Sequence, residues 1–155
     1  ILNALNQFVT RTLQQKQPDD IIKDGMDITV CTIDENGFQF AGAQNPLYWV
    51  HKGELQEIKG DKQPIGHVDV ETKSFNSHEL ERNKGDMIYL FSDGYADQFG
   101  GPKDKKFMYK QFKDLLSEIH MLKADKQEQK LKEAFLDWKG DTEQVDDVLV
   151  IGIRL

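Results

Sequence analysis

Two short stretches of the sequence could do metal chemistry, because each places carboxylates at the end of an apolar segment. Asp93-Gly94 follows "MIYLFS", and Asp146-Asp147 precedes "VLVIGIRL". If the two segments are neighbouring antiparallel strands, the end of the first lies beside the start of the second, and the carboxylates converge on one sheet edge. Converging carboxylates favour a hard cation such as Mg²⁺ or Mn²⁺. Gly94 would allow a close backbone approach or offer its carbonyl oxygen as a ligand.

Both acidic pairs also have purely structural interpretations. Asp-Gly is a strong hairpin-turn signal, so Asp93-Gly94 could simply connect two strands. Against this, "YADQFGG" after the pair does not resume a period-two pattern. Asp146 and Asp147 could instead mark a solvated strand entrance that blocks edge pairing. The sequence alone leaves both interpretations open.

The histidines give no comparable signal. His51, His67, His78 and His120 show no i, i+4 pairing and no accompanying Glu at metal spacing, which favours surface or core roles over metal binding. Beyond the metal ligands, the sequence contains no recognisable catalytic motif.

The composition indicates a soluble, globular chain of one domain. It has 155 residues, of which 38% are hydrophobic and 30% charged, a mixture too apolar for disorder and too charged for a membrane span. The formal net charge of -7 would repel nucleic acid, and no local basic patch offsets it. The single cysteine, Cys31, excludes an internal disulfide and suits a reducing compartment. We therefore expect a cytoplasmic domain without nucleic-acid or direct membrane contact.

The hydrophobic periodicity predicts an opening helix followed by antiparallel strands. Apolar residues at three- and four-residue steps indicate a helix over residues 1–16, ended near Pro18. From Met26 the period changes to two, and "DENG" makes a hairpin turn. "LYWVH" and "ELQEI" form a second hairpin around Lys52-Gly53. Strands that follow one another without intervening helices predict a mostly antiparallel sheet.

The last third of the chain predicts two helices and a strand. An apolar face runs from Met108 to Leu122, and a second helix opens at Asp125, with Glu128 three residues later, and closes near Gly140. The continuous apolar run in "VDDVLVIGIRL" predicts a central strand buried on both faces.

Five stretches, taken in order, resemble the successive motifs of a known enzyme family. They are "DGMDITVCTID", "FAGAQNPLYWV", "KQPIG", "GDMIYLFSDGYADQFGG" and "VDDVLVIGIRL". They are similar to motifs of the metal-dependent serine/threonine phosphatases of the protein phosphatase 2C (PP2C) type. More narrowly, they resemble its bacterial branch, typified by stage II sporulation protein E and by phosphatases that regulate stress sigma factors. The resemblance implies an α+β fold, an α-β-β-α sandwich of mostly antiparallel sheets with metal ions at one end.

The resemblance also implies roles for the acidic residues. Asp93 matches the family's metal-binding Asp, Asp146 matches its C-terminal metal-binding Asp, and Gly94 and Asp147 are their neighbours in the motifs. The implied chemistry is hydrolysis of phosphoserine or phosphothreonine on a protein substrate by a metal-activated water, with two Mn²⁺ or Mg²⁺ ions and no covalent enzyme intermediate. The implied substrate is a phosphorylated signalling protein such as an anti-anti-sigma factor.

One departure from the family pattern shapes the expectations. The family carries an upstream Asp-x-x-Gly-His-Gly motif whose Asp bridges the two ions, and this sequence lacks it. We therefore expect residues 1–155 to be the C-terminal portion of one phosphatase domain, truncated at its N-terminus, binding metal weakly if at all and not necessarily active alone. Open sheet edges would favour self-association. Upstream segments could anchor the parent protein to a membrane. A pseudophosphatase that binds phosphoproteins without hydrolysing them is the alternative function.

Overall fold

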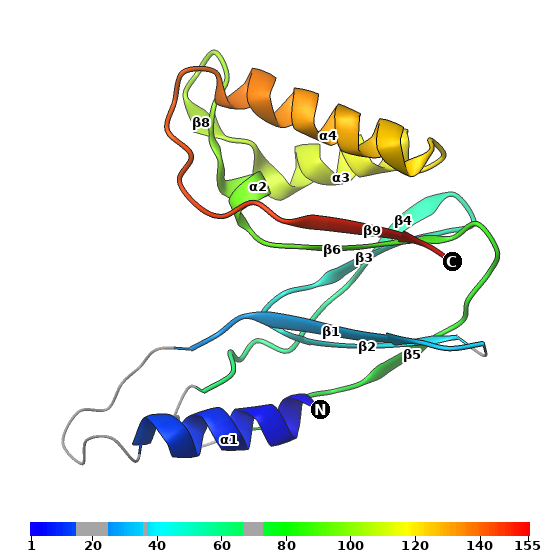
Figure 1. Cartoon of the computed structure of the whole chain (residues 1–155), viewed down its shortest axis with the longest axis vertical. Coiled ribbons are helices and arrows are strands. Elements are labelled where there is room, and N and C mark those ends of the chain that lie inside the picture. Colours follow the sequence, from blue (N-terminus) through cyan, green and yellow to red (C-terminus); the bar gives the residue numbers. More distant parts are fainter. Residues whose placement is uncertain (15–24, 36, 67–72) are drawn as a thin grey trace. The chain divides into compact units, whose positions relative to one another are not determined.

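The computed structural model describes residues 1–14, 25–35, 37–66 and 73–155. It combines helices with antiparallel sheets, as the sequence predicts (Figure 1). Its residues form two compact units. The first falls within Ile1–Leu47 and Glu57–Arg82, and the second within Tyr48–Gln56 and Asn83–Leu155. None of the helices in the described ranges is both long and apolar enough to span a bilayer.

The elements match most of the predicted segments. In chain order they are α1 (Leu2–Gln14), β1 (Ile28–Ile33), β2 (Phe38–Ala43), β3 (Leu47–His51), β4 (Glu54–Ile58), β5 (His78–Leu80), β6 (Met87–Phe91), α2 (Gly94–Asp97), β7 (Phe99–Gly100), β8 (Lys105–Lys106), α3 (Met108–Ile119), α4 (Ala124–Lys139) and β9 (Val150–Arg154). The predicted end of the first helix near Pro18 lies outside the described residues.

The first unit packs α1 against the sheet β1-β2-β5 (Figure 1). The apolar stripe of α1 and the facing strands share a core of Leu2, Leu5, Val9, Ile28, Val30, Ala41, Ala43, Ile65 and Phe75. Polar residues of the helix fix it further: the Asn6 side-chain oxygen accepts a hydrogen bond from the Gly66 amide at 2.7 Å, and that of Asn3 from the Phe75 amide at 2.8 Å. Burial of apolar side chains and hydrogen bonds to backbone amides thus hold α1 against the sheet and the segments beside it.

The second unit contains most of the sheet β4-β3-β6-β9, whose upper face in Figure 1 is covered by α3 and α4. Its core is rich in aromatic rings. Tyr95 lies 4.6 Å from Phe112 in a stacked arrangement and 5.3 Å from Phe107 edge-on, measured between ring centroids. Such ring pairs add about 0.5–1.5 kcal/mol each to the stability gained from area burial. This packing positions α2 and the end of β6.

The turn between β3 and β4 follows the sequence prediction. Lys52 and Gly53 both have positive φ, 50° and 83°, which is the backbone of a two-residue hairpin turn of the primed type. Gly53 adopts this conformation without strain because it lacks a Cβ.

The predicted central position of the last strand is wrong. In the described part of the chain β9 pairs only with β6 and lies at the edge of its sheet, and Ile151 remains 44% exposed. A continuous apolar run tells that a strand is apolar on both faces, but not which strands lie beside it. The strand also starts later than expected, at Val150, because the backbone groups of Asp147 and Leu149 bond to Ser92 instead.

The predicted start of the second helix also needs correction. α4 begins at Ala124 with Lys123 in the N-cap position, and Asp125 lies inside the first turn. Asp125 still favours the helix electrostatically, because acidic groups stabilise the first turn. The predicted end is confirmed: Gly140 caps the helix with φ 53°, and its amide donates to the Leu136 carbonyl oxygen at 2.9 Å.

Candidate metal centre at the ends of β6 and β9

The structure brings the two acidic segments together. β6 and β9 pair antiparallel, with Phe91 opposite Val150, so the residues after β6 lie beside those before β9. Asp93 therefore follows one strand at the same sheet edge where Asp146 and Asp147 precede the other. The backbones of the two acidic segments therefore lie at the same edge of the sheet, as expected.

The hairpin interpretation of Asp93-Gly94 is wrong. Asp93 is the N-cap residue of α2, and its carbonyl oxygen accepts a hydrogen bond from the Asp97 amide at 2.9 Å. The chain thus turns from β6 into a short helix rather than back into a strand paired with β6. This explains why "YADQFGG" shows no period-two pattern.

Ser92 ties the two segments to each other. Its hydroxyl donates to the Asp147 carbonyl oxygen at 2.8 Å and accepts from the Leu149 amide at 2.9 Å. Its own amide donates to the Leu149 carbonyl oxygen at 3.0 Å. Before β9 begins, hydrogen bonds to the Ser92 hydroxyl therefore take the place of backbone hydrogen bonds between strands. They fix the backbone next to the acidic pair.

Gly94 is required by a close approach of the same two segments. A Cβ placed on this buried glycine would collide with the Asp147 carbonyl oxygen and would lie 3.3 Å from the Asp146 carbonyl carbon. The expectation that the glycine permits close backbone approach is therefore met by the backbone of Asp146-Asp147.

Gln98 holds the loop that leads to the acidic pair. Its side chain is fully buried, and its amide nitrogen donates to the carbonyl oxygens of Phe99 at 2.9 Å and Glu143 at 2.8 Å. Its backbone carbonyl oxygen accepts from the Trp138 indole at 3.2 Å. Sequence reasoning missed both Ser92 and Gln98. The available signal for Gln98 was a single amide in the mainly apolar stretch that follows the "SDG" motif.

The carboxylates themselves are open to solvent. Asp93, Asp146 and Asp147 are all exposed, and the Asp146 side chain accepts a hydrogen bond from the Asp147 amide at 2.7 Å. Nearby Asp97 is different, because it pairs with Lys106 at 2.8 Å. The three exposed groups are oxygen donors of the kind that Mn²⁺ and Mg²⁺ prefer.

The donor set is nevertheless small. Among the described residues, no cluster of three or more His, Cys, Asp or Glu side chains has the geometry of a metal site. Mg²⁺-type ions keep several waters and need only one or two protein carboxylates. The residues present therefore fit a hydrated ion held by few protein ligands.

The described histidines have ordinary structural surroundings. His51 Nδ1 lies 2.9 Å from the buried Asp86 carboxylate, His78 stacks on Phe40, and His120 Nδ1 lies 2.7 Å from the Ser117 carbonyl oxygen. Burial opposes the ionisation of Asp86, but hydrogen bonds from His51 and from two backbone amides hold its pKa below the ordinary value. His67 lies outside the described residues.

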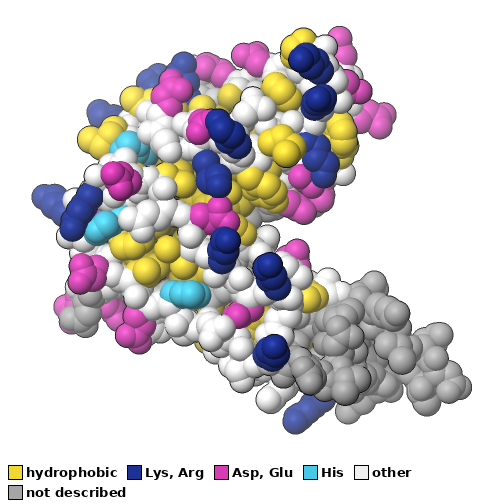
Figure 2. All heavy atoms as spheres, turned by 180° about the vertical axis from the view of Figure 1, so that it is seen from behind, with side chains coloured by type: hydrophobic (Ala, Val, Ile, Leu, Met, Phe, Trp, Pro, Cys, Tyr) yellow, Lys and Arg dark blue, Asp and Glu magenta, His cyan; other side chains and the backbone are white. Residues whose placement is uncertain are grey.

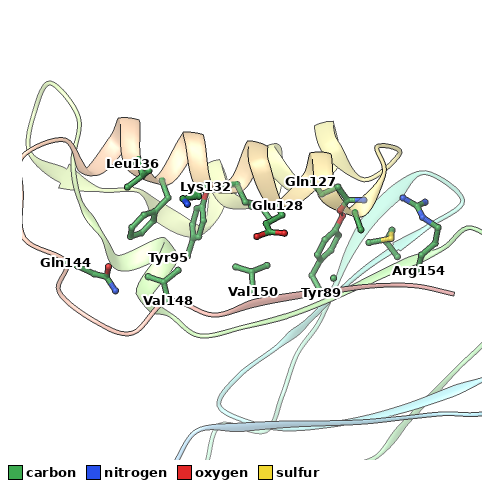
Figure 3. A pocket seen from close by; sticks show the side chains of 15 residues that line it. Tyr89, Tyr95, Gln127, Glu128, Lys132, Leu136, Gln144, Val148, Val150 and Arg154 are labelled. Atoms are coloured by element: carbon green, nitrogen blue, oxygen red, sulfur yellow. The ribbon is translucent and has the colours of Figure 1, made fainter.

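A groove of about 640 Å³ lies in the second unit, between α4 and the strands β6 and β9 (Figure 3). Figure 3 shows Val148 and Val150 pointing up from β9 and its approach towards α4. At its far end the Tyr89 hydroxyl donates to Gln127 at 2.7 Å, and burial raises the pKa of Tyr89 to about 12 despite the opposing charge of Arg154. None of the three exposed carboxylates lines this groove. It is therefore separate from the candidate metal centre.

On the face shown in Figure 2, acidic and basic side chains are interspersed over the described surface. Neither sign dominates there, so that face does not indicate a ligand by its charge alone.

Comparisons with known proteins identify the family and the fold of this chain. The family described as Stage II sporulation protein E (SpoIIE) matches residues 1–155. The solved SiaA-PP2C domain of Pseudomonas aeruginosa superposes with a TM-score of 0.78 at 23% identity, over 99% of this chain and 66% of that domain. The phosphatase domain of SpoIIE from Bacillus subtilis, presoaked with Mn, gives 0.58 at 17% identity, over 97% of this chain and 63% of that one.

A third solved structure has the same fold. The serine/threonine phosphatase PstP of Mycobacterium tuberculosis gives a TM-score of 0.62 at 17% identity, over 97% of this chain and 67% of that one. The comparison with curated proteins gave no significant match. The chain thus spans about two thirds of the solved domains it resembles, and the antiparallel α+β fold is that of PP2C-type phosphatase domains. Because the family match extends over its whole length, the chain belongs to the stage II sporulation protein E family.

Proposed function

We propose that residues 1–155 are the C-terminal portion of one catalytic domain that hydrolyses phosphoserine or phosphothreonine on a signalling protein. The observation that carries this proposal is the adjacency of Asp93-Gly94 and Asp146-Asp147, held by the Ser92 hydroxyl. Family membership supports the phosphatase class. A metal-dependent hydrolase needs carboxylates from neighbouring segments close together at one edge of its sheet, and this adjacency supplies them.

In this proposal Asp93 and Asp146 bind Mn²⁺ or Mg²⁺, while Asp147 and the Gly94 carbonyl oxygen are secondary ligands. When bound, such ions lower the pKa of water and neutralise charge on the phosphoryl group. The residues of this chain keep the two carboxylate-bearing segments in a fixed register. Ser92 orients the Asp147 backbone, and Gly94 leaves room for it.

The finer assignments rest on the family resemblance. We assign a phosphorylated anti-anti-sigma factor as the substrate class, two metal ions in the complete domain, a bacterial signalling role and a cytoplasmic location. The assigned substrate class defines which phosphoproteins to test first.

A second candidate function is a pseudophosphatase that binds a phosphoprotein without hydrolysing it. The observation in its favour is that no three metal-ligating side chains cluster among the described residues. A site with so few ligands could attract a metal and a phosphate group without activating water.

The deciding experiment is hydrolysis of a simple aryl phosphate across a Mn²⁺ titration, with Mn²⁺ binding followed by electron paramagnetic resonance. We expect weak Mn²⁺ binding and little or no turnover by residues 1–155 alone, because the sequence lacks the Asp-x-x-Gly-His-Gly motif. Where turnover is measurable, Asp93→Asn should lower kcat by about 100-fold or more, the scale seen when one transition-state-stabilising group is removed. Asp141→Asn is the matched control, because Asp141 is exposed and lies outside the site.

Each other outcome is informative. Turnover that Asp93→Asn abolishes would show that the remaining carboxylates form a working centre, and it would contradict the expected incomplete site. Mn²⁺ binding without turnover fits both the incomplete catalytic site and the pseudophosphatase, and an Asp-x-x-Gly-His-Gly motif upstream of Ile1 in the parent gene would favour the enzyme. Mn²⁺ effects that persist in Asp93→Asn would remove these residues from the metal centre.

A further inference from the structure

The two acidic segments of the candidate site supply no positive charge of their own. Residues 92–98 and 141–149 include several Asp and Glu residues but no Lys, Arg or His. A phosphoryl group carries a charge of about −1.5 to −2 at neutral pH, so exposed carboxylates repel it. Besides a metal ion, a side-chain cation that binds the phosphoryl oxygens must therefore come from another segment.

Lys106 in β8 brings a cation to one of these segments. Its Nζ lies 2.8 Å from the Asp97 carboxylate. Asp97 follows Asp93 by one turn of α2, and its amide donates to the Asp93 carbonyl oxygen at 2.9 Å. Side chains four residues apart lie on the same side of a helix, with about 5–6 Å between their Cβ atoms. The Lys106 ammonium thus lies about one helical turn from the Asp93 carboxylate.

The ammonium group of Lys106 remains accessible. The side chain is 41% exposed, and its Nζ lies 6.0 Å from the centre of the Phe99 ring, within reach of a cation–π contact. An ammonium has three N–H bonds, and Asp97 accepts one of them in the part of the chain that the structure describes. The others are available for the oxygens of a ligand.

The backbone on both sides of Lys106 is fixed. The Lys105 carbonyl oxygen accepts a hydrogen bond from the Trp138 indole at 3.2 Å, which joins β8 to α4. The amide of buried Phe107 donates to the Gln98 carbonyl oxygen at 2.9 Å, at the C-terminal end of α2. The long side chain of Lys106 therefore starts from a base that keeps its position relative to α2.

We propose that the Lys106 ammonium binds the phosphoryl group of the substrate beside the candidate metal centre. Lysine binds phosphate as a compact point charge with several donors, so it can contact a phosphoryl oxygen while it keeps its bond to Asp97. In the free chain, the same ammonium balances the charge of Asp97. This inference rests on the proposed function, and it adds a residue that binds the substrate directly.

The charge of the surrounding hairpin suits an anionic ligand. Residues 99–106 contain three lysines and one aspartate, a formal charge of +2, whereas the whole chain carries -7. Lys103 and Lys105 are exposed. A local excess of positive charge raises the concentration of anions near it, which favours the approach of a phosphorylated segment to this hairpin.

The test is a titration of this chain with O-phosphoserine in an excess of Mg²⁺, followed through the amide shifts in ¹H–¹⁵N NMR spectra. Mg²⁺ is diamagnetic and leaves the signals sharp. We expect saturable shifts at residues 93–97 and 105–107. Lys106→Gln should raise the phosphoserine dissociation constant by about tenfold, the loss expected for one hydrogen bond to a charged group.

Two variants are the controls. Lys130 also pairs with a carboxylate, that of Glu133 at 3.7 Å, but this pair lies on α4 and Lys130 is 58% exposed. Lys130→Gln should change the phosphoserine dissociation constant by less than about twofold. Asp97→Asn keeps the Lys106 ammonium and removes only its partner, so it should not weaken phosphoserine binding.

A Mg²⁺ titration without phosphoserine separates substrate binding from a structural role. Lys106→Gln removes a positive charge near the metal, so the Mg²⁺ affinity should stay equal or rise. If the ion pair with Asp97 served only to hold the hairpin in place, Lys106→Gln and Asp97→Asn would weaken Mg²⁺ and phosphoserine binding alike. That result would overturn the proposal.

The same titrations separate this inference from the proposed function. Mg²⁺ shifts that Asp93→Asn abolishes, combined with phosphoserine binding that Lys106→Gln leaves unchanged, would overturn the role of Lys106 and retain the metal centre. Phosphoserine shifts that require Lys106 but neither Mg²⁺ nor Asp93 would retain the role of Lys106 and count against the metal centre. A spectrum without phosphoserine shifts at residues 105–107, with or without Mg²⁺, would overturn the role of Lys106.

Discussion

Ser92 joins the two acidic segments through a single hydroxyl group. It donates to the Asp147 carbonyl oxygen and accepts from the Leu149 amide, so both functions of the hydroxyl are used. Gly94 adds the space into which the Asp147 backbone fits. Neither residue has a carboxylate, but both position the backbone segments that carry the carboxylates. Positioning of this kind determines how well a few ligands can hold an ion.

The Ser92→Ala variant should separate positioning from ligation. We expect the free energy of unfolding to fall by about 1 kcal/mol, the net value of hydrogen bonds at a partly exposed site. Mn²⁺ affinity, measured by paramagnetic titration, should fall about tenfold or more, as for other groups that orient metal ligands. Ser117→Ala, on the exposed side of α3, is the control and should change neither quantity. Unchanged Mn²⁺ affinity in Ser92→Ala would contradict the positioning role.

At the scale of elements, two turns of the second unit are joined by one buried carboxylate. Asp86 accepts from the Asn83 amide at 3.2 Å in the turn before β6, and from the Lys52 amide at 3.3 Å in the turn between β3 and β4. His51 Nδ1 lies 2.9 Å away. Because these contacts favour the charged carboxylate over the effect of burial, its pKa is lowered.

The lowered pKa of Asp86 predicts a pH dependence of stability. The stabilisation is complete above the unfolded-state pKa, about 3.9 for Asp, and is lost as the pH falls through the lower folded-state pKa. The free energy of unfolding, measured by urea titration between about pH 6 and 2, should therefore fall less steeply for Asp86→Asn than for the unmodified chain. Asp114→Asn, which removes an exposed partner of Lys110, should keep the original slope. Equal slopes for all three proteins would refute this role of Asp86.

At the scale of the whole molecule, the three exposed carboxylates of the candidate site all belong to the second unit. The first unit contributes α1 and the sheet β1-β2-β5, which carry none of the proposed ligands. Metal binding should therefore stabilise the second unit near the site and leave the first unit unchanged.

Mn²⁺ should protect amides at residues 92–97 and 144–149 from hydrogen exchange and leave those of α1 unchanged. A ligand at about 100 times its dissociation constant stabilises the bound form by about 2.7 kcal/mol. Asp93→Asn should remove this protection, and Asp141→Asn should preserve it. Protection that appears first in α1 would place the metal elsewhere.

Most of the local structure could be predicted from the sequence. The period-two and helical patterns predicted the two hairpins, the Lys52-Gly53 turn and the C-terminal helices, because these depend on interactions between residues a few positions apart. The predicted convergence of the two acidic segments required β6 and β9 to be antiparallel neighbours, and the structure shows that they are. The N-cap predicted at Asp125 lies two residues after the observed N-cap, Lys123, which is within the usual uncertainty of helix boundaries.

The sequence by itself determined the family, the antiparallel α+β class and the acidic residues at two strand ends, since these are properties of residue types in order. Only the tertiary structure decided that β9 pairs with β6 alone among the described strands, that Ser92 bonds to the Asp147 backbone and that Gly94 faces that same backbone. The Ser92 bond, for example, joins residues that are 55 positions apart in the sequence. Such contacts depend on which strands become neighbours, and hydrophobic periodicity along one segment carries no information about the neighbours of that segment.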